Sequence, residues 1–213
     1  SILTAGLVGA FLRLWNIRDQ VLVGDEIHAL RAALDNDLAS VLTTYRVADP
    51  CLPLAGLLRL AIDLGIPISE MLMRLPILLT GVLTVVALPL LLGRLAPCAR
   101  PTRSALAWLL ALSPTLILYS RIVRPYAPIV LWCGLAAGCF WIFWNAWRGG
   151  EGDGSRNGQR HVRWAVAGFL VSATLAVWFH LGTAPLVAAL FGYALLDLAI
   201  ARPADWLRLA RKL

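Results

Sequence analysis

Charge is scarce in this sequence. Asp, Glu, Lys and Arg together make up 15% of its 213 residues, whereas hydrophobic residues make up 60%. Soluble domains typically carry about a quarter of charged residues and a lower apolar share. The mean hydropathy of +0.76 points the same way. The composition therefore excludes an ordinary soluble domain and favours a protein that lies in a membrane.

Other absences narrow the possible functions. The four cysteines, at positions 51, 98, 133 and 139, show neither a disulfide framework nor the spacing of a metal site. The glycine-rich stretch 149–158 lacks the G-x-x-x-x-G-K pattern of a phosphate-binding loop and is typical of a flexible linker. No cleavable signal peptide precedes the first apolar run, so we expect this run to direct insertion itself. Because the sequence starts at Ser1 within that run and stops at Leu213 within a basic segment, we also expect both ends to be truncated.

Six long apolar runs dominate what is present. Each approaches the ~20 residues that a helix needs to cross about 30 Å of hydrocarbon. The runs are 2–17, 75–93, 104–120, 125–147, 164–181 and 183–201. We therefore predict an all-α protein, in which residues 1–213 form a single polytopic transmembrane helix bundle of about six spans.

The positively charged residues sort between these runs. Arginines cluster at 94–103, at 148–163 and, together with Lys212, at 202–212. The positive-inside rule places such segments in the cytoplasm. This orientation accounts for the net charge of +7 without a nucleic-acid partner, and it makes residues 18–74 a large external loop.

The external loop has an organisation of its own. Apolar residues in its first half recur at helical spacing: Ile27, Leu30, Leu34, Leu38 and Val41. This pattern predicts an amphipathic helix that lies in the outer membrane interface with its apolar face down. A second apolar segment, 54–64, is too short to span. We expect it to form a second interfacial helix, because a crossing there would turn the arginine-rich segments outward.

The adjacent carboxylates Asp25 and Glu26 are the most informative pair in the chain. They follow the first apolar run, where desolvating a carboxylate costs free energy, so we expect them to be solvated, paired or functional. Here a carboxylate can act as a general base or hold a cation. Gly24-Asp25 before a helix is also typical of an N-cap worth ~1 kcal/mol, and this alternative stays open.

Further polar side chains are expected in the external loop and at the outer ends of the spans. Those that we expect to contact substrate are His28, Arg59, Arg74, Arg124, Tyr126 and His180. Guanidinium groups bind phosphate bidentately and keep their charge when partly desolvated. For Arg124, a phosphate contact and a lipid-headgroup contact are both open, whereas for Arg121 a headgroup contact is favoured. Arg59 also lies four residues before Asp63, which predicts an intrahelical ion pair.

The order of motifs along the chain adds a family resemblance. The motifs are Leu12-Arg13-Leu14-Trp15, Asp25-Glu26, Arg74-Leu75-Pro76, Gly81-Val82-Leu83-Thr84-Val85, Ser113-Pro114, Tyr119-Ser120, Arg124-Pro125-Tyr126-Ala127 and Phe179-His180. The series resembles the N-terminal part of GT-C-fold integral-membrane glycosyltransferases. It is most similar to the bacterial relatives of protein O-mannosyltransferases and of the aminoarabinose transferase of lipid A.

The resemblance implies a multi-pass enzyme of the bacterial cytoplasmic (inner) membrane with an outward-facing active site. Such enzymes transfer a sugar from a polyprenyl-phosphate-linked donor to a hydroxyl of a lipid, glycan or protein acceptor. The family's catalytic carboxylate maps onto Asp25, with Glu26 beside it, either as a base or as a ligand of a divalent metal ion. The family's R-P-Y motif maps onto Arg124, Pro125 and Tyr126.

The sequence also departs from the family pattern. The stretch 49–53 reads Asp-Pro-Cys-Leu-Pro where the family often has His-Pro-Pro or Lys-Pro-Pro, and Ile122 stands where close relatives often carry a glutamate. The alternative function is a non-catalytic module that binds or transports a polyprenyl-phosphate lipid. The carboxylate pair discriminates between the two, because a carrier of an anionic lipid gains nothing from carboxylates beside the phosphate.

Overall fold

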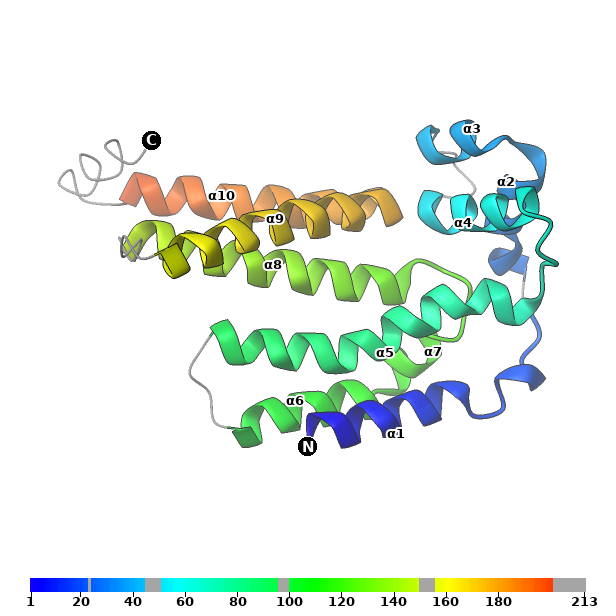
Figure 1. Cartoon of the computed structure of the whole chain (residues 1–213), viewed down its shortest axis with the longest axis horizontal. Helices are drawn as coiled ribbons and strands as arrows, with labels where there is room; N and C mark the ends of the chain where they lie inside the picture. The colour runs from blue at the N-terminus through cyan, green and yellow to red at the C-terminus, as the bar shows by residue number, and fades with distance from the viewer. Residues whose placement is uncertain (23, 45–50, 96–99, 150–155, 201–213) are drawn as a thin grey trace.

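The structure is a computed structural model that describes residues 1–22, 24–44, 51–95, 100–149 and 156–200. Within these ranges the chain forms helices and no strand, which confirms the all-α prediction. Figure 1 shows the longest helices side by side along the long axis of the molecule. The motif residues Asp49 and Pro50, the cysteine Cys98 and the basic segment 202–212 lie outside the described residues.

Four helices in the described part of the chain are long and apolar enough to cross a membrane. They are α5 (Glu70–Leu95), α8 (Tyr126–Gly149), α9 (Arg156–Phe179) and α10 (Ala184–Ile200). Each overlaps one of the predicted apolar runs. The chain is therefore a membrane protein by the length and composition of its helices.

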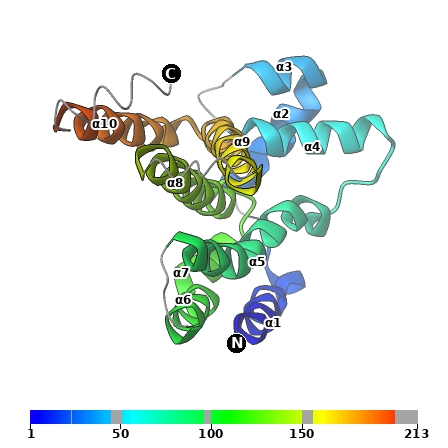
Figure 2. The same cartoon turned by 60° about the vertical axis from the view of Figure 1, so that its left-hand side comes forward.

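The other two predicted spans form shorter helices. Residues 2–17 fold into α1 (Ile2–Leu14), which has 13 residues, followed by η1 (Ile17–Asp19). Residues 104–120 fall on α6 (Arg100–Leu112) and α7 (Pro114–Tyr119), which Ser113 separates. Proline has no N–H to donate to the carbonyl four residues earlier, so a helix tends to break at Pro114. α1 and α6 pack on each other and on α5 (Figure 2), and the count of about six spans stays a prediction.

Glycines let the central helices approach closely. Gly134 and Gly138 lie one turn apart on α8, and a Cβ atom at either position would meet Leu88 or Leu91 of α5. A Cβ atom on Gly168 of α9 would lie 2.8 Å from Cys139 Sγ on α8. In membranes, close backbone approach through small residues is a main source of helix association. The contacts of α8 with α5 and α9 thus depend on these glycines.

The two ends of the bundle differ in composition. At one end lie η2 (Gly24–Ile27), α2 (His28–Asp35), α3 (Leu38–Thr43) and α4 (Leu52–Asp63), which we call the α2–α4 end. A buried cluster that includes Ala33, Leu54, Ile77 and Phe179 joins these short helices to the long ones. The ends of the long helices that carry the arginines at 94–103 and 148–163 lie at the opposite end (Figure 1), and the orientation of the bundle in a membrane stays a prediction.

The single amphipathic helix predicted over residues 27–41 is wrong. The chain breaks between α2 and α3, because Asp37 Oδ1 accepts a hydrogen bond of 2.7 Å from Ser40 N–H and caps α3. This hydrogen bond lowers the pKa of the Asp37 carboxyl. Ala29 and Ala33 face the core in place of Leu34, which is 58% exposed. Whether α2, α3 and α4 lie in a membrane interface stays a prediction.

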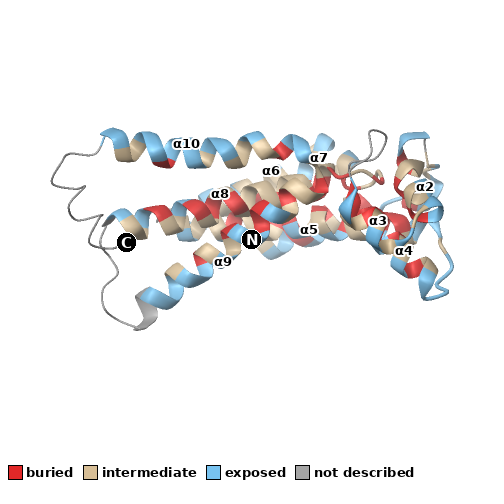
Figure 3. Cartoon of the chain, turned by 90° about the horizontal axis from the view of Figure 1, so that it is seen from above, coloured by how far each residue is buried: buried red, intermediate tan, exposed pale blue. Residues whose placement is uncertain are grey.

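α10 packs loosely against the bundle. Figure 3 shows it exposed along most of its length. Its main polar tie is Asp197, which accepts hydrogen bonds from Trp144 Nε1 at 2.7 Å and from the Arg148 guanidinium. A carboxylate near the end of an apolar helix is stabilised when it is paired in this way.

We predict that Gly138→Val lowers the thermal stability of the purified protein in detergent. The added methyl groups would overpack the contact with Leu91, a change that typically costs about 1–3 kcal/mol. Gly192→Val is the matched control, since nothing lies within 4 Å of a Cβ atom there. Equal changes in melting temperature for both variants would show that the α5–α8 contact does not require glycine.

Candidate functional site

At the α2–α4 end, the adjacent residues Asp25 and Glu26 form hydrogen bonds with the adjacent residues Val123 and Arg124. Glu26 Oε1 accepts a hydrogen bond of 2.6 Å from Val123 N–H, and Arg124 Nη1 donates one of 3.2 Å to the Asp25 carbonyl oxygen. We call these four residues the loop–turn clasp. The clasp joins the segment after α1 to the turn between α7 and α8, and so brings the sequence-predicted residues Asp25, Glu26 and Arg124 together.

The two carboxylates of the clasp lie in different surroundings. Glu26 is 2% exposed, whereas the Asp25 side chain is 80% exposed. Burying a carboxylate is tolerated where it is hydrogen-bonded, as Glu26 is by the Val123 amide. In this structure Glu26 is bonded to the turn, and Asp25 is the carboxylate that is accessible from solvent.

Asp25 does not cap the helix that follows it. It lies inside η2, and the N-cap of α2 is Ile27, with no side-chain capping bond. The nearest basic partner is His28, whose Nε2 lies 3.6 Å from Asp25 Oδ1. Asp25 is therefore not the N-cap of α2, and capping does not explain why a carboxylate stands at this position.

Arg124 faces a ring as well as the clasp. Its guanidinium carbon lies 6.0 Å from the centre of the Tyr126 ring, and that ring lies 4.7 Å from the ring of Tyr119. Within the described residues, no carboxylate forms an ion pair with Arg124. A guanidinium that bonds only a carbonyl and a ring face can still attract an anion.

The remaining predicted arginines hold backbone carbonyls. Arg74 is 2% exposed and donates to the carbonyl oxygens of Ile17 at 3.0 Å and Gln20 at 2.7 Å. Arg59 donates to the Ala33 carbonyl at 3.3 Å. It also bonds Asp63, which confirms the predicted intrahelical pair and raises the pKa of the Arg59 guanidinium.

His180 and Arg121 also have local partners. His180 Nδ1 accepts a hydrogen bond of 3.0 Å from Gly182 N–H and caps η3 (Leu181–Thr183). Arg121 Nη2 donates to the carbonyl oxygen of Asn16 at 3.3 Å. None of the contacts described for His180, Arg59 or Arg74 reaches Asp25 or Arg124.

A contact between two motif residues, Arg13 and Ser120, was not predicted from the sequence. Arg13 is 1% exposed, and its Nε donates to Ser120 Oγ at 3.0 Å, at the start of the same turn. The available signal was an arginine inside an apolar run, four residues before the run ends at Ile17. A charged residue in such a position is costly unless it is paired, and it calls for a partner.

The donor set around Asp25 does not fit the divalent metal ion that the resemblance allows. The Glu26 carboxylate is engaged by Val123 N–H, which leaves His28 as the nearest potential ligand. Across the described ranges, no three His, Cys, Asp or Glu side chains are grouped to hold a metal ion.

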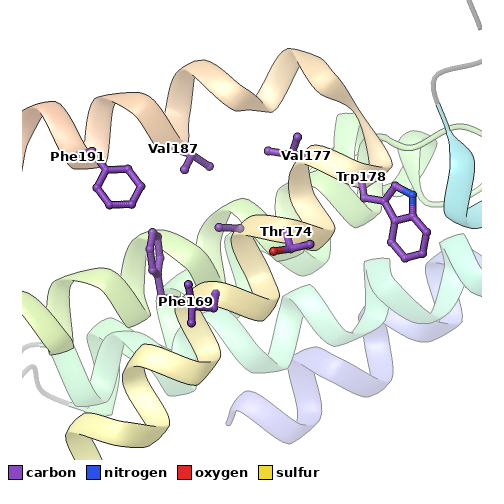
Figure 4. A pocket seen from close by; sticks show the side chains of 8 residues that line it. Phe169, Thr174, Val177, Trp178, Val187 and Phe191 are labelled. Carbon is purple, nitrogen blue, oxygen red and sulfur yellow. The ribbon is translucent and has the colours of Figure 1, made fainter. Parts of the chain in front are cut away.

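An apolar groove of about 720 Å³ lies between α9 and α10 (Figure 4). Its lining residues are Phe169, Leu170, Ala173, Thr174, Val177, Trp178, Val187 and Phe191. Trp178, at one end of the groove, donates an indole hydrogen bond of 3.1 Å to the Leu42 carbonyl oxygen of α3. The groove thus runs from the middle of the bundle towards the α2–α4 end.

Comparisons with known proteins add no family. No protein-family model matches the chain, and no curated protein or solved structure is similar enough to count as a match. The resemblance to GT-C glycosyltransferases therefore rests on the motifs of the sequence alone.

We predict that Glu26→Ala destabilises the protein and that Asp25→Ala does not. The first substitution leaves Val123 N–H without its acceptor, at a cost of about 1–3 kcal/mol. The second changes an exposed side chain, which usually alters stability by no more than about 0.5 kcal/mol. Thermal unfolding of both variants in the same detergent checks this, and a larger loss for Asp25→Ala would reverse the two assignments.

Proposed function

We propose that the chain is the transmembrane module of a glycosyltransferase. It transfers a sugar from a polyprenyl-phosphate-linked donor to an acceptor hydroxyl at the outer face of the bacterial cytoplasmic membrane. The observation that carries the proposal is the loop–turn clasp, which holds an exposed carboxylate, Asp25, next to the cationic and aromatic pair Arg124 and Tyr126. The order of motifs supports the choice of family, and the clasp supports a site at which its chemistry could take place.

The proposed orientation rests on charge. The arginines at 94–103 and 148–163 lie at the end opposite to α2, α3 and α4, and basic segments stay in the cytoplasm. In the proposal α1 and the interrupted pair α6–α7 complete about six spans, and the short helices α2–α4 cover the outer ends of the bundle in the interface. The clasp then faces outward, where polyprenyl-phosphate sugars are used.

The proposed reaction is one displacement at the anomeric carbon. The Asp25 carboxylate takes the proton of the acceptor hydroxyl while its oxygen attacks that carbon. The bond from the anomeric carbon to the phosphate oxygen breaks, and its electron pair leaves with the lipid phosphate. Arg124 stabilises the negative charge that develops on the phosphate. The products are the glycosylated acceptor and the polyprenyl phosphate, with inversion at the anomeric centre.

The groove between α9 and α10 supports a lipid-linked donor. Its walls are almost wholly apolar, and it extends towards the end of the bundle that holds the clasp. A polyprenyl chain is a long apolar ligand that would gain from leaving the bilayer only where the walls match its shape. In the proposal the tail lies along this groove and the phosphate lies at Arg124.

The groove is also the one observation that favours the alternative function. A non-catalytic module that binds or transports a polyprenyl phosphate needs the groove and the arginine but no base. The two functions differ at Asp25, because a carboxylate beside the phosphate weakens the binding of an anion by repulsion.

We predict that Asp25→Asn nearly abolishes sugar transfer and leaves folding and lipid binding intact. The amide keeps the size of the side chain but cannot accept the proton of the acceptor hydroxyl. Transfer is measured as the release of polyprenyl phosphate by the protein in nanodiscs, with thermal unfolding as the control for folding. Wild-type turnover by Asp25→Asn would leave the lipid-binding alternative as the better account.

We predict that Arg124→Lys weakens donor binding more than Arg121→Lys does. Each arginine donates one Nη hydrogen bond to a backbone carbonyl, so the structural loss is matched in the two variants. Lysine keeps the charge but loses the fork that binds phosphate. The loss of a charged hydrogen bond, about 1.5–3 kcal/mol, lowers affinity roughly ten- to a hundredfold. Equal small losses of affinity at both positions would contradict the proposed contact between Arg124 and the phosphate.

We predict that Val187→Trp selectively weakens the binding of long-chain polyprenyl phosphates. The indole would fill the groove from α10, where Val187 is part of the lining. Leu195→Trp is the matched control, since Leu195 is 69% exposed on the same helix and does not line the groove. Affinities for a long-chain and a short-chain polyprenyl phosphate are compared in nanodiscs. The same loss for both chain lengths would place the tail elsewhere.

A further inference from the structure

Arg13 is a charged residue inside the helix bundle. It lies on α1, is 1% exposed, and forms no ion pair with a carboxylate in the part of the chain that the structure describes. Charged residues among membrane-spanning helices are expensive and persist where their donors are satisfied or where they have a function. The stability of Arg13 in this position therefore depends on the groups that accept its hydrogen bonds.

All the hydrogen bonds described for Arg13 go to neutral oxygens. Nη1 donates to the carbonyl oxygens of Gly9 at 3.0 Å and Ala111 at 3.3 Å, and Nη2 donates to that of Leu110 at 3.2 Å. Nε donates to Ser120 Oγ at 3.0 Å. One guanidinium thus connects α1 to the end of α6 and to the residue that follows α7.

The break between α6 and α7 explains why these carbonyls accept from Arg13. Within a continuous helix, Leu110 would accept from the N–H of residue 114, but Pro114 has none. The last carbonyls of a helix also carry its negative partial charge, which favours a cation. Arg13 thus donates to carbonyl groups at the break, including that of Leu110, whose usual helical partner would be Pro114.

The fourth contact extends from the break to the proposed site. Ser120 accepts from Arg13 and donates its own hydroxyl to the Leu116 carbonyl, and it is 1% exposed. A Cβ atom on Gly81 of α5 would collide with Ser120 Oγ and lie 3.3 Å from Arg13 Nε, so only glycine leaves room for this hydrogen bond. Ser120 begins the turn that carries Val123 and Arg124, four residues from the proposed phosphate contact.

We infer that Arg13 is a positioning residue for the proposed phosphate site. By holding Ser120 it fixes the start of the turn, and the clasp fixes the turn again at Val123. Arg13 lies within the bundle and touches no substrate; it acts through Ser120 on the placement of Arg124. The inference rests on the proposed function for the identity of the ligand, a polyprenyl phosphate, and not for the coupling of Arg13 to the turn.

Ser120→Ala is the variant that separates positioning from general stability. It removes the acceptor of Nε but leaves the three carbonyl contacts of Arg13, two of which, to Leu110 and Ala111, lie at the break. Arg13→Lys is the companion variant and loses the fork. Thr80→Ala is the control, because the Thr80 hydroxyl likewise donates to carbonyls of its own helix, at Pro76 and Ile77, but Thr80 is less buried than Ser120 and has no described bond to Arg13.

The first measurement does not depend on function. A cysteine replaces Ile122 in the turn, the native cysteines are replaced by alanine, and the rate of labelling by a maleimide in detergent is measured. Ser120→Ala should raise this rate about fivefold, the factor expected for the loss of one neutral hydrogen bond, while Thr80→Ala leaves it unchanged. Equal rates for the two variants would overturn the inference.

The second measurement uses polyprenyl phosphate binding in nanodiscs. Ser120→Ala should lower the affinity about fivefold with little change in melting temperature. Arg13→Lys, which keeps the charge but loses the fork, should also lower the affinity. Faster labelling with unchanged affinity, in a protein whose wild type binds the lipid, would overturn the assignment to the phosphate site. A wild type that binds no polyprenyl phosphate would refute the proposed function, and labelling alone would then decide whether Arg13 positions the turn.

Discussion

The hydrogen bonds of the Arg13 guanidinium tie α1 to the interrupted helix α6–α7 and to Ser120, where the turn that carries Arg124 begins. Pro114 interrupts the helix, and Arg13 supplies donors to the carbonyls of Leu110 and Ala111 at the break. Because the same side chain reaches Ser120, the break also fixes where the next turn begins. A local defect in one helix thereby determines the position of a turn that carries an exposed cation.

The loop–turn clasp then divides two neighbouring carboxylates between structure and chemistry. Glu26 is buried against Val123 N–H and holds the turn, whereas Asp25 points to solvent beside His28. The same contact leaves Arg124 facing Tyr126, a short distance along the chain from the buried anchor. The proposed transferase chemistry needs this separation, since a base must be reachable and the group that positions it must not move.

Sequence alone predicted the coarse fold because hydrophobic length is a local property. The runs at 75–93, 125–147, 164–181 and 183–201 became long helices, as expected. The break at Asn36-Asp37 was missed because the capping bond of Asp37 competes with an apolar period that continues through it. Glu26 and Asp25 look alike in the sequence, and only the contact with Val123, 97 residues away, separates them. For Arg74 the structure adds carbonyl partners at Ile17 and Gln20, which lie more than 50 residues away and which the sequence pattern could not show.

In the proposed function, the phosphate of a polyprenyl lipid binds at the turn between α7 and α8. The most direct test is photo-crosslinking of the protein in nanodiscs with a polyprenyl phosphate that carries a photoreactive group beside the phosphate, followed by mass-spectrometric mapping of the adducts. We expect adducts on residues 120–126 and 25–28. Adducts confined to the opposite end, around Arg100 and Arg103, would contradict it.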